Sequence, residues 1–154
     1  MLILLVTMLA GGLQAQLSFQ FMPALNGQTI NGLFTAQLQH TGPGSYYGRV
    51  KITVKEEGNK TVLAVITPEI TVKPGANMFT SLMPQSRLQF GNTAAASLLS
   101  QTGRFPEGDY EYCFEFTGAE NKINAGEQVF DDCFNYFLRL IALNSYLTPT
   151  LLVE

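Results

Sequence analysis

The sequence predicts an all-β fold, an antiparallel β-sandwich of the immunoglobulin or fibronectin type with one short helix before a turn at Phe105. Short alternating segments are separated by turn signals every ~8–12 residues, a pattern typical of such sandwiches. The chain's two cysteines, Cys113 and Cys133, lie in two of these segments. Phe and Tyr are abundant (11 and 6 residues) and Trp is absent, which suits an aromatic and β-branched core.

The two cysteine segments have the clearest alternation. Side chains of a strand alternate between its faces with period two. One face of the first strand therefore carries an aromatic row, and the other carries Cys113 between two glutamates. The second strand also carries an aromatic row on one face and Cys133 on the other face. The rows are Tyr110, Tyr112, Phe114 and Phe116 on the first strand, and Phe130, Phe134, Tyr136 and Leu138 on the second.

An antiparallel pairing with Cys113 opposite Cys133 would place Tyr112 against Phe134 and Tyr110 against Tyr136. Each aromatic cross-strand pair of this kind adds roughly 0.2–1 kcal/mol. Asp132 does not fit this arrangement, because the same register places its carboxylate on the aromatic face. A β-bulge near Asp132 would resolve the conflict.

We expect Cys113 and Cys133 to form one disulfide between neighbouring strands, on the face away from the aromatic core. This differs from the immunoglobulin pattern, in which the bridge crosses between the two sheets. The cysteines lack the close spacing of zinc-binding knuckles, so a bridge is favoured over a metal site. The competing outcome is a pair of reduced, buried thiols. We expect no cofactor.

The remaining strands are read from alternation and from turn residues. The segment 47–55 is the clearest, with Val50, Ile52 and Val54 facing the core and charged residues facing out. In the segment 33–40, Phe34 and Leu38 face inward. The predicted strands are 17–21, 33–40, 47–55, 62–66, 70–72 and 88–90.

A short helix is predicted over residues 92–101. Asn92 or Thr93 can cap its start, three alanines follow, and Gly103 lies where a C-terminal glycine belongs. Leu98 and Leu99 would pack inward. The alternative is a loop that contains alanines by chance.

The length of 154 residues fits one domain with additional ends. Residues 1–15 are interpreted as a secretory signal peptide, 16–138 as the sandwich, and 139–154 as an exit segment toward a downstream domain. The apolar run that begins at Leu2 is too short for a spanning helix, which needs about 20 residues. No transmembrane span is expected, and export permits a disulfide.

Charge and residue types exclude several functions. The net charge is −3 and there is no basic cluster, so nucleic acid is not expected as a partner. The single histidine, His40, ends a strand beside a Gly/Pro loop, where we expect a rim residue with solvent access. The acidic pairs Glu56-Glu57 and Asp131-Asp132 would point to opposite faces of a strand. No catalytic residue is therefore predicted.

The segment Thr102 to Cys113, with its block Phe-Pro-Glu-Gly-Asp-Tyr-Glu-Tyr-Cys, and the second cysteine strand carry a resemblance. They resemble the N-terminal immunoglobulin-like domain of large exported Bacteroidota proteins of the TANFOR-domain type. The resemblance implies a secreted or outer-membrane-surface protein with fibronectin-like repeats downstream, although the periplasm is also compatible. Its partners would be downstream domains or surface and secretion-system proteins.

Two functional hypotheses follow. The first is a non-catalytic extracellular or cell-surface interaction or spacer domain of a larger exported protein. The second is a carbohydrate- or protein-binding adhesin module with its own ligand site, and the dipeptide Tyr46-Tyr47 is a candidate aromatic patch. A core role for these tyrosines is the alternative. An exposed aromatic platform on one sheet would favour the second hypothesis.

The mature protein is expected to begin at Gln16, because a short apolar core is followed by Leu-Gln-Ala. N-terminal sequencing or the intact mass of exported material measures this directly. Exported material that retains residues 1–15 would contradict the interpretation.

Overall fold

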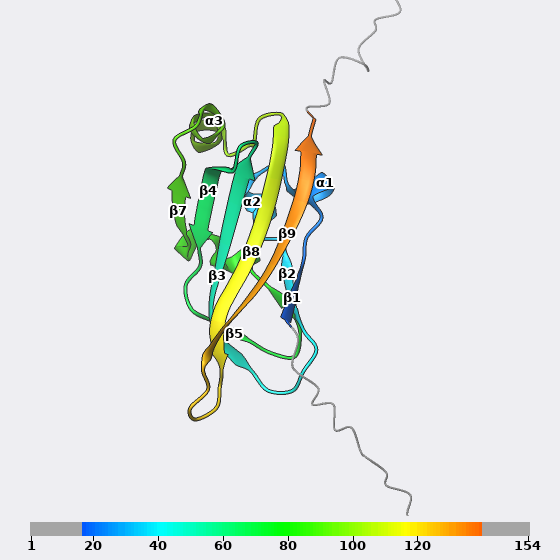
Figure 1. Ribbon diagram of the computed structural model, residues 1–154, viewed down its shortest axis with the longest axis vertical. Coiled ribbons are helices and arrows are strands. Elements are labelled where there is room, and N and C mark those ends of the chain that lie inside the picture. The colour runs from blue at the N-terminus through cyan, green and yellow to red at the C-terminus, as the bar shows by residue number, and fades with distance from the viewer. Residues whose placement is uncertain (1–16, 140–154) are drawn as a thin grey trace, which may run out of the picture.

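The computed structural model describes residues 17–139 as two antiparallel sheets arranged as a sandwich (Figure 1). The larger sheet contains β7 (Arg87–Phe90), β4 (Lys60–Ile66), β3 (Tyr46–Glu56), β8 (Gly108–Glu120) and β9 (Glu127–Leu138) in that order, and β5 (Ile70–Val72) also pairs with β3. The smaller sheet contains β1 (Leu17–Gln20), β2 (Gln37–His40) and β6 (Gly75–Met78). The predicted all-β sandwich is confirmed. The predicted signal peptide lies outside the described residues, as does the exit segment beyond Arg139.

The pairing of β3 with β8 forms the centre of the larger sheet. Their register is continuous from Tyr46 opposite Glu120 to Glu56 opposite Tyr110. Gly48 lies opposite Gly118, and a Cβ added at either glycine would clash with the backbone of the other strand. The strands can approach this closely only because neither residue carries a side chain.

The core follows the predicted alternation. Val50, Ile52 and Val54 are fully buried, and the aromatic row of β8 is buried beside them. Burying each such side chain contributes about 1.5–3 kcal/mol. The long strands therefore have one apolar face and one polar face, and the smaller sheet covers the apolar face.

Aromatic side chains of β1 and its exit join the two sheets. The ring centroids of Phe19 and Phe114 lie 5.5 Å apart. The Phe21 ring lies 4.9 Å from that of Phe114, 5.5 Å from that of Tyr112 and 6.0 Å from that of Phe134. Tilted and edge-on contacts at these distances are the favourable geometries for aromatic pairs.

The strands β4 and β5 run along the same side of β3, and Thr67 bridges the interruption between them. The Thr67 amide donates to the Val50 carbonyl oxygen (3.0 Å), and the Thr67 hydroxyl oxygen accepts from the Val50 amide (3.0 Å). Pro68, which has no amide hydrogen, follows immediately. A buried threonine side chain thus replaces one rung of the ladder where proline interrupts the strand.

The helix α3 (Ala94–Thr102) is in the predicted place. The Thr93 hydroxyl accepts from the Ala96 amide (3.1 Å), and Gly103 ends the helix with φ of 70°. Leu99 is buried, but Leu98 is 49% exposed, so the prediction that both leucines pack inward is wrong. Consecutive helical residues point about 100° apart, and a short helix on a sheet edge buries only one stripe.

The predicted strand 33–40 is only half correct. The strand β2 begins at Gln37, and the helix α2 (Ile30–Leu33) precedes it. The Thr29 hydroxyl caps α2 by accepting from the Gly32 amide (3.0 Å). Phe34 and Leu38 are buried as predicted, although Phe34 lies outside the strand. The turn at Phe34 and Thr35 that follows α2 occupies the first half of the predicted strand, and the Thr35 hydroxyl donates there to the Gly32 carbonyl oxygen (2.7 Å).

Three further elements lacked a recognisable sequence pattern. They are α1 (Pro23–Asn26), β6, and the 3₁₀ helix η1 (Thr80–Gln85). In β6, the Asn77 side-chain amide donates to the carbonyl oxygens of Leu38 (3.1 Å), Lys73 (2.8 Å) and Gly75 (3.2 Å). The Leu38 contact reinforces the backbone pairing of β6 with β2, and the other two hydrogen bonds fix the turn that leads into β6.

Replacing Tyr112 by phenylalanine should destabilise the domain by about 1–2 kcal/mol. Burial raises the pKa of the Tyr112 phenol, which stays protonated and donates to the Gly27 carbonyl oxygen (2.7 Å). The substitution would leave that buried oxygen without its donor. Chemical denaturation measures the loss, and Tyr47→Phe, at a tyrosine that is 54% exposed, is the control. Equal stabilities of the two variants would contradict this account of the Gly27 contact.

Candidate functional site on the outer face of the larger sheet

The Cys113–Cys133 disulfide lies on the outer face of the larger sheet, away from the smaller sheet. The two cysteines are directly opposite each other on β8 and β9, with Cα atoms 4.1 Å apart. Tyr112 faces Phe134 and Tyr110 faces Tyr136, so the predicted register is confirmed. The bridge joins neighbouring strands of one sheet, as predicted, and does not cross between sheets.

Short side chains form a row across the sheet at the level of the disulfide. Thr53 pairs with Cys113 and with Ala64 on its other side, so the row runs over β4, β3, β8 and β9. Longer side chains flank the row, with Lys51, Glu115 and Asp131 on one side and Lys55, Glu111 and Asn135 on the other. A shallow hollow results, with the disulfide on its floor.

Charges on this outer face are segregated by strand. The strand β3 contributes Arg49, Lys51 and Lys55, whereas β8 contributes Glu111 and Glu115. Lys51 lies opposite Glu115, and Lys55 lies opposite Glu111. Within residues 17–139, the ion pairs closer than 4.0 Å are Arg49–Glu69 and Lys122–Glu120. Among the described residues the facing lysines and glutamates thus form no ion pair within this distance, and Glu115 accepts a hydrogen bond from the Thr117 hydroxyl (3.4 Å).

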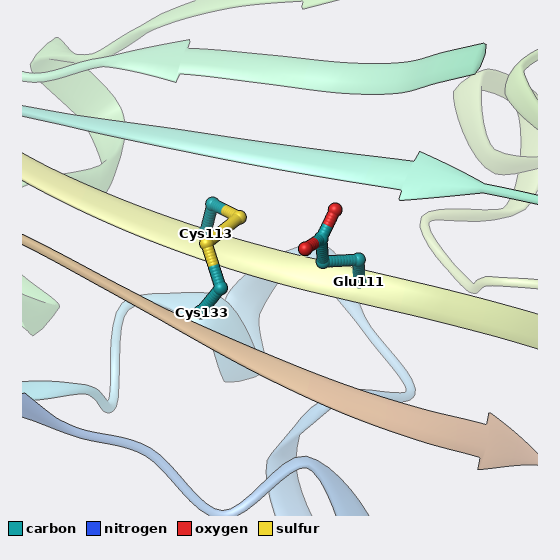
Figure 2. Close-up of side chains that lie close together, drawn as sticks. All are labelled: Glu111, Cys113 and Cys133. Carbon is teal, nitrogen blue, oxygen red and sulfur yellow. A yellow bond between two sulfur atoms is a disulfide. The ribbon is translucent and has the colours of Figure 1, made fainter. Parts of the chain in front are cut away.

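Glu111 lies beside the disulfide, as Figure 2 shows. Its carboxylate and both sulfur atoms lie within 4.8 Å of one another. Zinc and similar ions bind cysteine as the thiolate. With both sulfurs bonded to each other, this group offers a metal one carboxylate, which is too few ligands for a site.

His40 is buried, with 3% of its surface exposed, so the predicted rim position with solvent access is wrong. Its ring packs edge-on against Tyr46 with centroids 5.3 Å apart. Both ring nitrogens are buried without a hydrogen-bond partner. The alternation that places Leu38 inward also places His40 inward, two residues later, and this signal was present in the sequence.

Tyr46 connects the buried His40 to a charged pair at the surface. The Tyr46 hydroxyl donates to Glu120 (3.1 Å), and the Lys122 ammonium lies 2.6 Å from the other oxygen of that carboxylate. Burial and the Glu120 hydrogen bond raise the pKa of Tyr46. The hydrogen bond from Lys122, followed by that from Tyr46, lowers the pKa of Glu120. These contacts keep the phenol protonated and the carboxylate ionised.

Tyr46 and Tyr47 separate to opposite faces of β3. Tyr46 is 2% exposed and belongs to the core, whereas Tyr47 is 54% exposed on the outer face. Tyr47 borders a second shallow hollow, together with Arg49, Glu69, Thr117 and Glu127. The aromatic patch considered from the sequence thus reduces to a single tyrosine.

The acidic pair Asp131-Asp132 also divides between the two faces of its strand. Asp131 is exposed on the outer face, and Asp132 points toward the smaller sheet. No β-bulge occurs, because the β8–β9 register is unbroken from Gly108 to Ala119. Instead, the Asp132 carboxylate accepts a hydrogen bond from the Phe19 amide (2.7 Å). The apparent misfit on the aromatic face is a link between the sheets.

Comparison with protein families, curated proteins and solved structures found no match to this chain. The resemblance of the segment Thr102 to Cys113 therefore stays a prediction. Within residues 17–139, no helix is long and apolar enough to cross a membrane. The disulfide indicates an oxidising, extracytoplasmic environment.

Replacing both cysteines by serine should lower the free energy of unfolding by about 3 kcal/mol, because the bridge closes a loop of 20 residues. The domain should still fold, since its buried core does not include either sulfur. Denaturation of the double variant measures the loss, and reduced wild-type protein is the control. An unchanged midpoint in both samples would contradict the expected contribution of the bridge.

Proposed function

We propose that this chain supplies a non-catalytic interaction or spacer domain of a larger exported protein, located outside the cell or at the cell surface. The observation that carries the proposal is the solvent-facing disulfide between β8 and the edge strand β9 of the six-stranded sheet. Disulfides form and persist in oxidising compartments and are rare in the cytosol. It ties the last strand to the centre of the sheet, which suits a rigid structural module.

The placement of the reactive side chains supports a non-catalytic role. A histidine that acts as a general base must reach its substrate within hydrogen-bond distance. His40 is enclosed beside Tyr46 instead. Asp132 is held by the Phe19 amide, and Asp131 points to the other face of the sheet. These groups do not converge on one reacting atom.

The resemblance to the N-terminal domains of TANFOR-type exported Bacteroidota proteins supports the same proposal. It would make residues 16–138 one module of a longer chain, with residues 139–154 leading to the next domain. The expected partners are then downstream domains or proteins of the cell surface and secretion system. The proposed location is the outer-membrane surface or the exterior, with the periplasm as the other extracytoplasmic compartment.

A second candidate function is a carbohydrate- or protein-binding adhesin module. The exposed Tyr47 favours it, because a phenol ring beside charged side chains offers a stacking surface and hydrogen-bonding groups. Arg49 and Glu69 lie beside this ring and pair with each other at 3.6 Å. A glycan in the hollow would stack on Tyr47 and exchange hydrogen bonds with this pair.

The proposal is tested on exported, disulfide-bonded protein with a broad panel of hydrolase substrates and a glycan-binding screen. We expect no turnover, and the same background rate for wild type and His40→Ala, because the imidazole cannot reach a substrate. Turnover that His40→Ala abolishes would overturn the non-catalytic proposal. Glycan binding that Tyr47→Ala removes and Tyr110→Phe preserves would favour the adhesin module instead.

A further inference from the structure

The strand β9 forms a long edge of the larger sheet (Figure 1). It has 12 residues, whereas β7 at the opposite edge and the edge strands β1 and β6 of the smaller sheet have 4 residues each. Exposed edge strands can pair with another chain, and short edge strands are one protection against it. By this criterion β9 is the least protected edge among the described strands.

The position of the disulfide reveals which backbone groups of β9 face this edge. Opposite residues of an antiparallel pair lie about 4.5 Å apart at positions that are not hydrogen-bonded, and about 5.5 Å apart at positions that are. The Cα atoms of Cys113 and Cys133 lie 4.1 Å apart, which identifies a pair that is not hydrogen-bonded. The N–H and C=O groups of Cys133 therefore point away from β8.

The same parity holds along the strand, because the register is unbroken. The backbone groups of Val129, Asp131, Asn135 and Phe137 thus also point to the edge. Within the part of the chain that the structure describes, no backbone hydrogen bond pairs them. They present a ladder of donors and acceptors to a further strand.

The usual guards of an edge strand are missing from β9 or already used. It contains no lysine, arginine or proline. An inward-pointing charge is another guard, but the Asp132 carboxylate is bound by the Phe19 amide. β1 and α1 also lie close to β9, but among the described residues no backbone hydrogen bond joins either element to it. Val129 is 58% exposed and Phe137 is 44% exposed, which adds apolar surface.

Charge indicates which kind of strand would fit. Glu127, Asp131 and Asp132 are the ionisable side chains of β9, apart from Tyr136, and all three are acidic. On the inner face, Phe130 and Phe134 are only partly buried. A strand beside β9 would gain from basic residues on the outer face and apolar residues on the inner face. The sheet already contains this arrangement, since Lys51 and Lys55 of β3 face Glu115 and Glu111 of β8.

We propose that the β9 edge binds an extended segment of a partner protein in which apolar residues alternate with lysine or arginine, by addition of a strand. This rests on the proposed function, because it names the surface through which an interaction domain would act. A second copy of this chain is the poorer occupant. Pairing β9 with itself would bring together two strands that each carry three carboxylates and no cation.

The probe is a synthetic peptide of about ten residues that alternates lysine and valine, a length that matches a strand. Its control has the same composition with the lysines and valines in separate blocks. The binding of each peptide to the mature, disulfide-bonded chain is measured by amide chemical shifts and hydrogen exchange. We expect saturable binding of the alternating peptide and slower exchange at Asp131, Cys133 and Asn135, whose amides face the edge.

Two variants locate the binding. Asp131→Lys should weaken the alternating peptide by roughly tenfold, because attraction across the strands becomes repulsion. Asn135→Pro should remove binding while the sheet stays folded, since the lost amide hydrogen does not bond to β8. Glu57→Lys makes the same charge change on an exposed hairpin turn and should leave binding unchanged. If Asn135→Pro disturbs the fold, Asp131→Lys still decides the question.

Several results would overturn the proposal. They are equal binding of both peptides, equal weakening by Asp131→Lys and Glu57→Lys, or exchange protection that excludes the odd-numbered amides of β9. Slow hydrogen exchange of the odd-numbered β9 amides in the chain without peptide would also overturn it. If that chain were a dimer, β9 would be paired with itself. If it were a monomer, another segment of the chain would occupy the edge. Export and the absence of turnover test the proposed function separately. A negative peptide-binding result would therefore overturn the β9 proposal and leave the proposed function standing.

Discussion

The register between β8 and β9 is the constraint on which the rest of the structure depends. With Cys113 opposite Cys133, the even-numbered aromatic side chains of both strands share the face that points to the smaller sheet. This places Tyr112, Phe114 and Phe134 in one aromatic cluster. A slip by one residue would expose the aromatic row and bury the charged one, because the side-chain period is two. The disulfide and the aromatic core therefore select the same pairing.

Asp132 shows how a local conflict can serve the whole fold. Its carboxylate interrupts an aromatic face, yet it satisfies the Phe19 amide at the edge of the smaller sheet. A buried or half-buried donor without a partner costs more than a hydrogen bond contributes, so this contact joins the two sheets where Phe19 and Phe21 enter the core. The charged residue compensates an edge strand that would otherwise leave its amide unpaired.

Alternation in the sequence was sufficient to predict the long strands and the disulfide, because each of these strands has one apolar and one polar face. It failed where side-chain hydrogen bonds determine the backbone. The turn at Phe34 and Thr35, where the Thr35 hydroxyl donates to Gly32, replaces the first half of the expected strand 33–40, and Asn77 reinforces β6 without an apolar pattern. His40 was misplaced for a different reason, since its polarity suggested the surface although its parity with Leu38 indicated the core. The hollow over the disulfide depends on the β3–β8 register, which the sequence alone does not contain.

The odd-numbered residues of β9 carry both the outward backbone groups and the disulfide cysteine. Which residue pairs of β8 and β9 are not hydrogen-bonded can be measured directly. In an antiparallel sheet, the α-hydrogens of opposite residues are closest at pairs that are not hydrogen-bonded. We expect strong nuclear Overhauser effects between the α-hydrogens of Cys113 and Cys133, of Glu111 and Asn135, and of Glu115 and Asp131. Strong effects between the α-hydrogens of Tyr112 and Phe134 instead would contradict this expectation, because the backbone groups of the odd-numbered residues would then face β8.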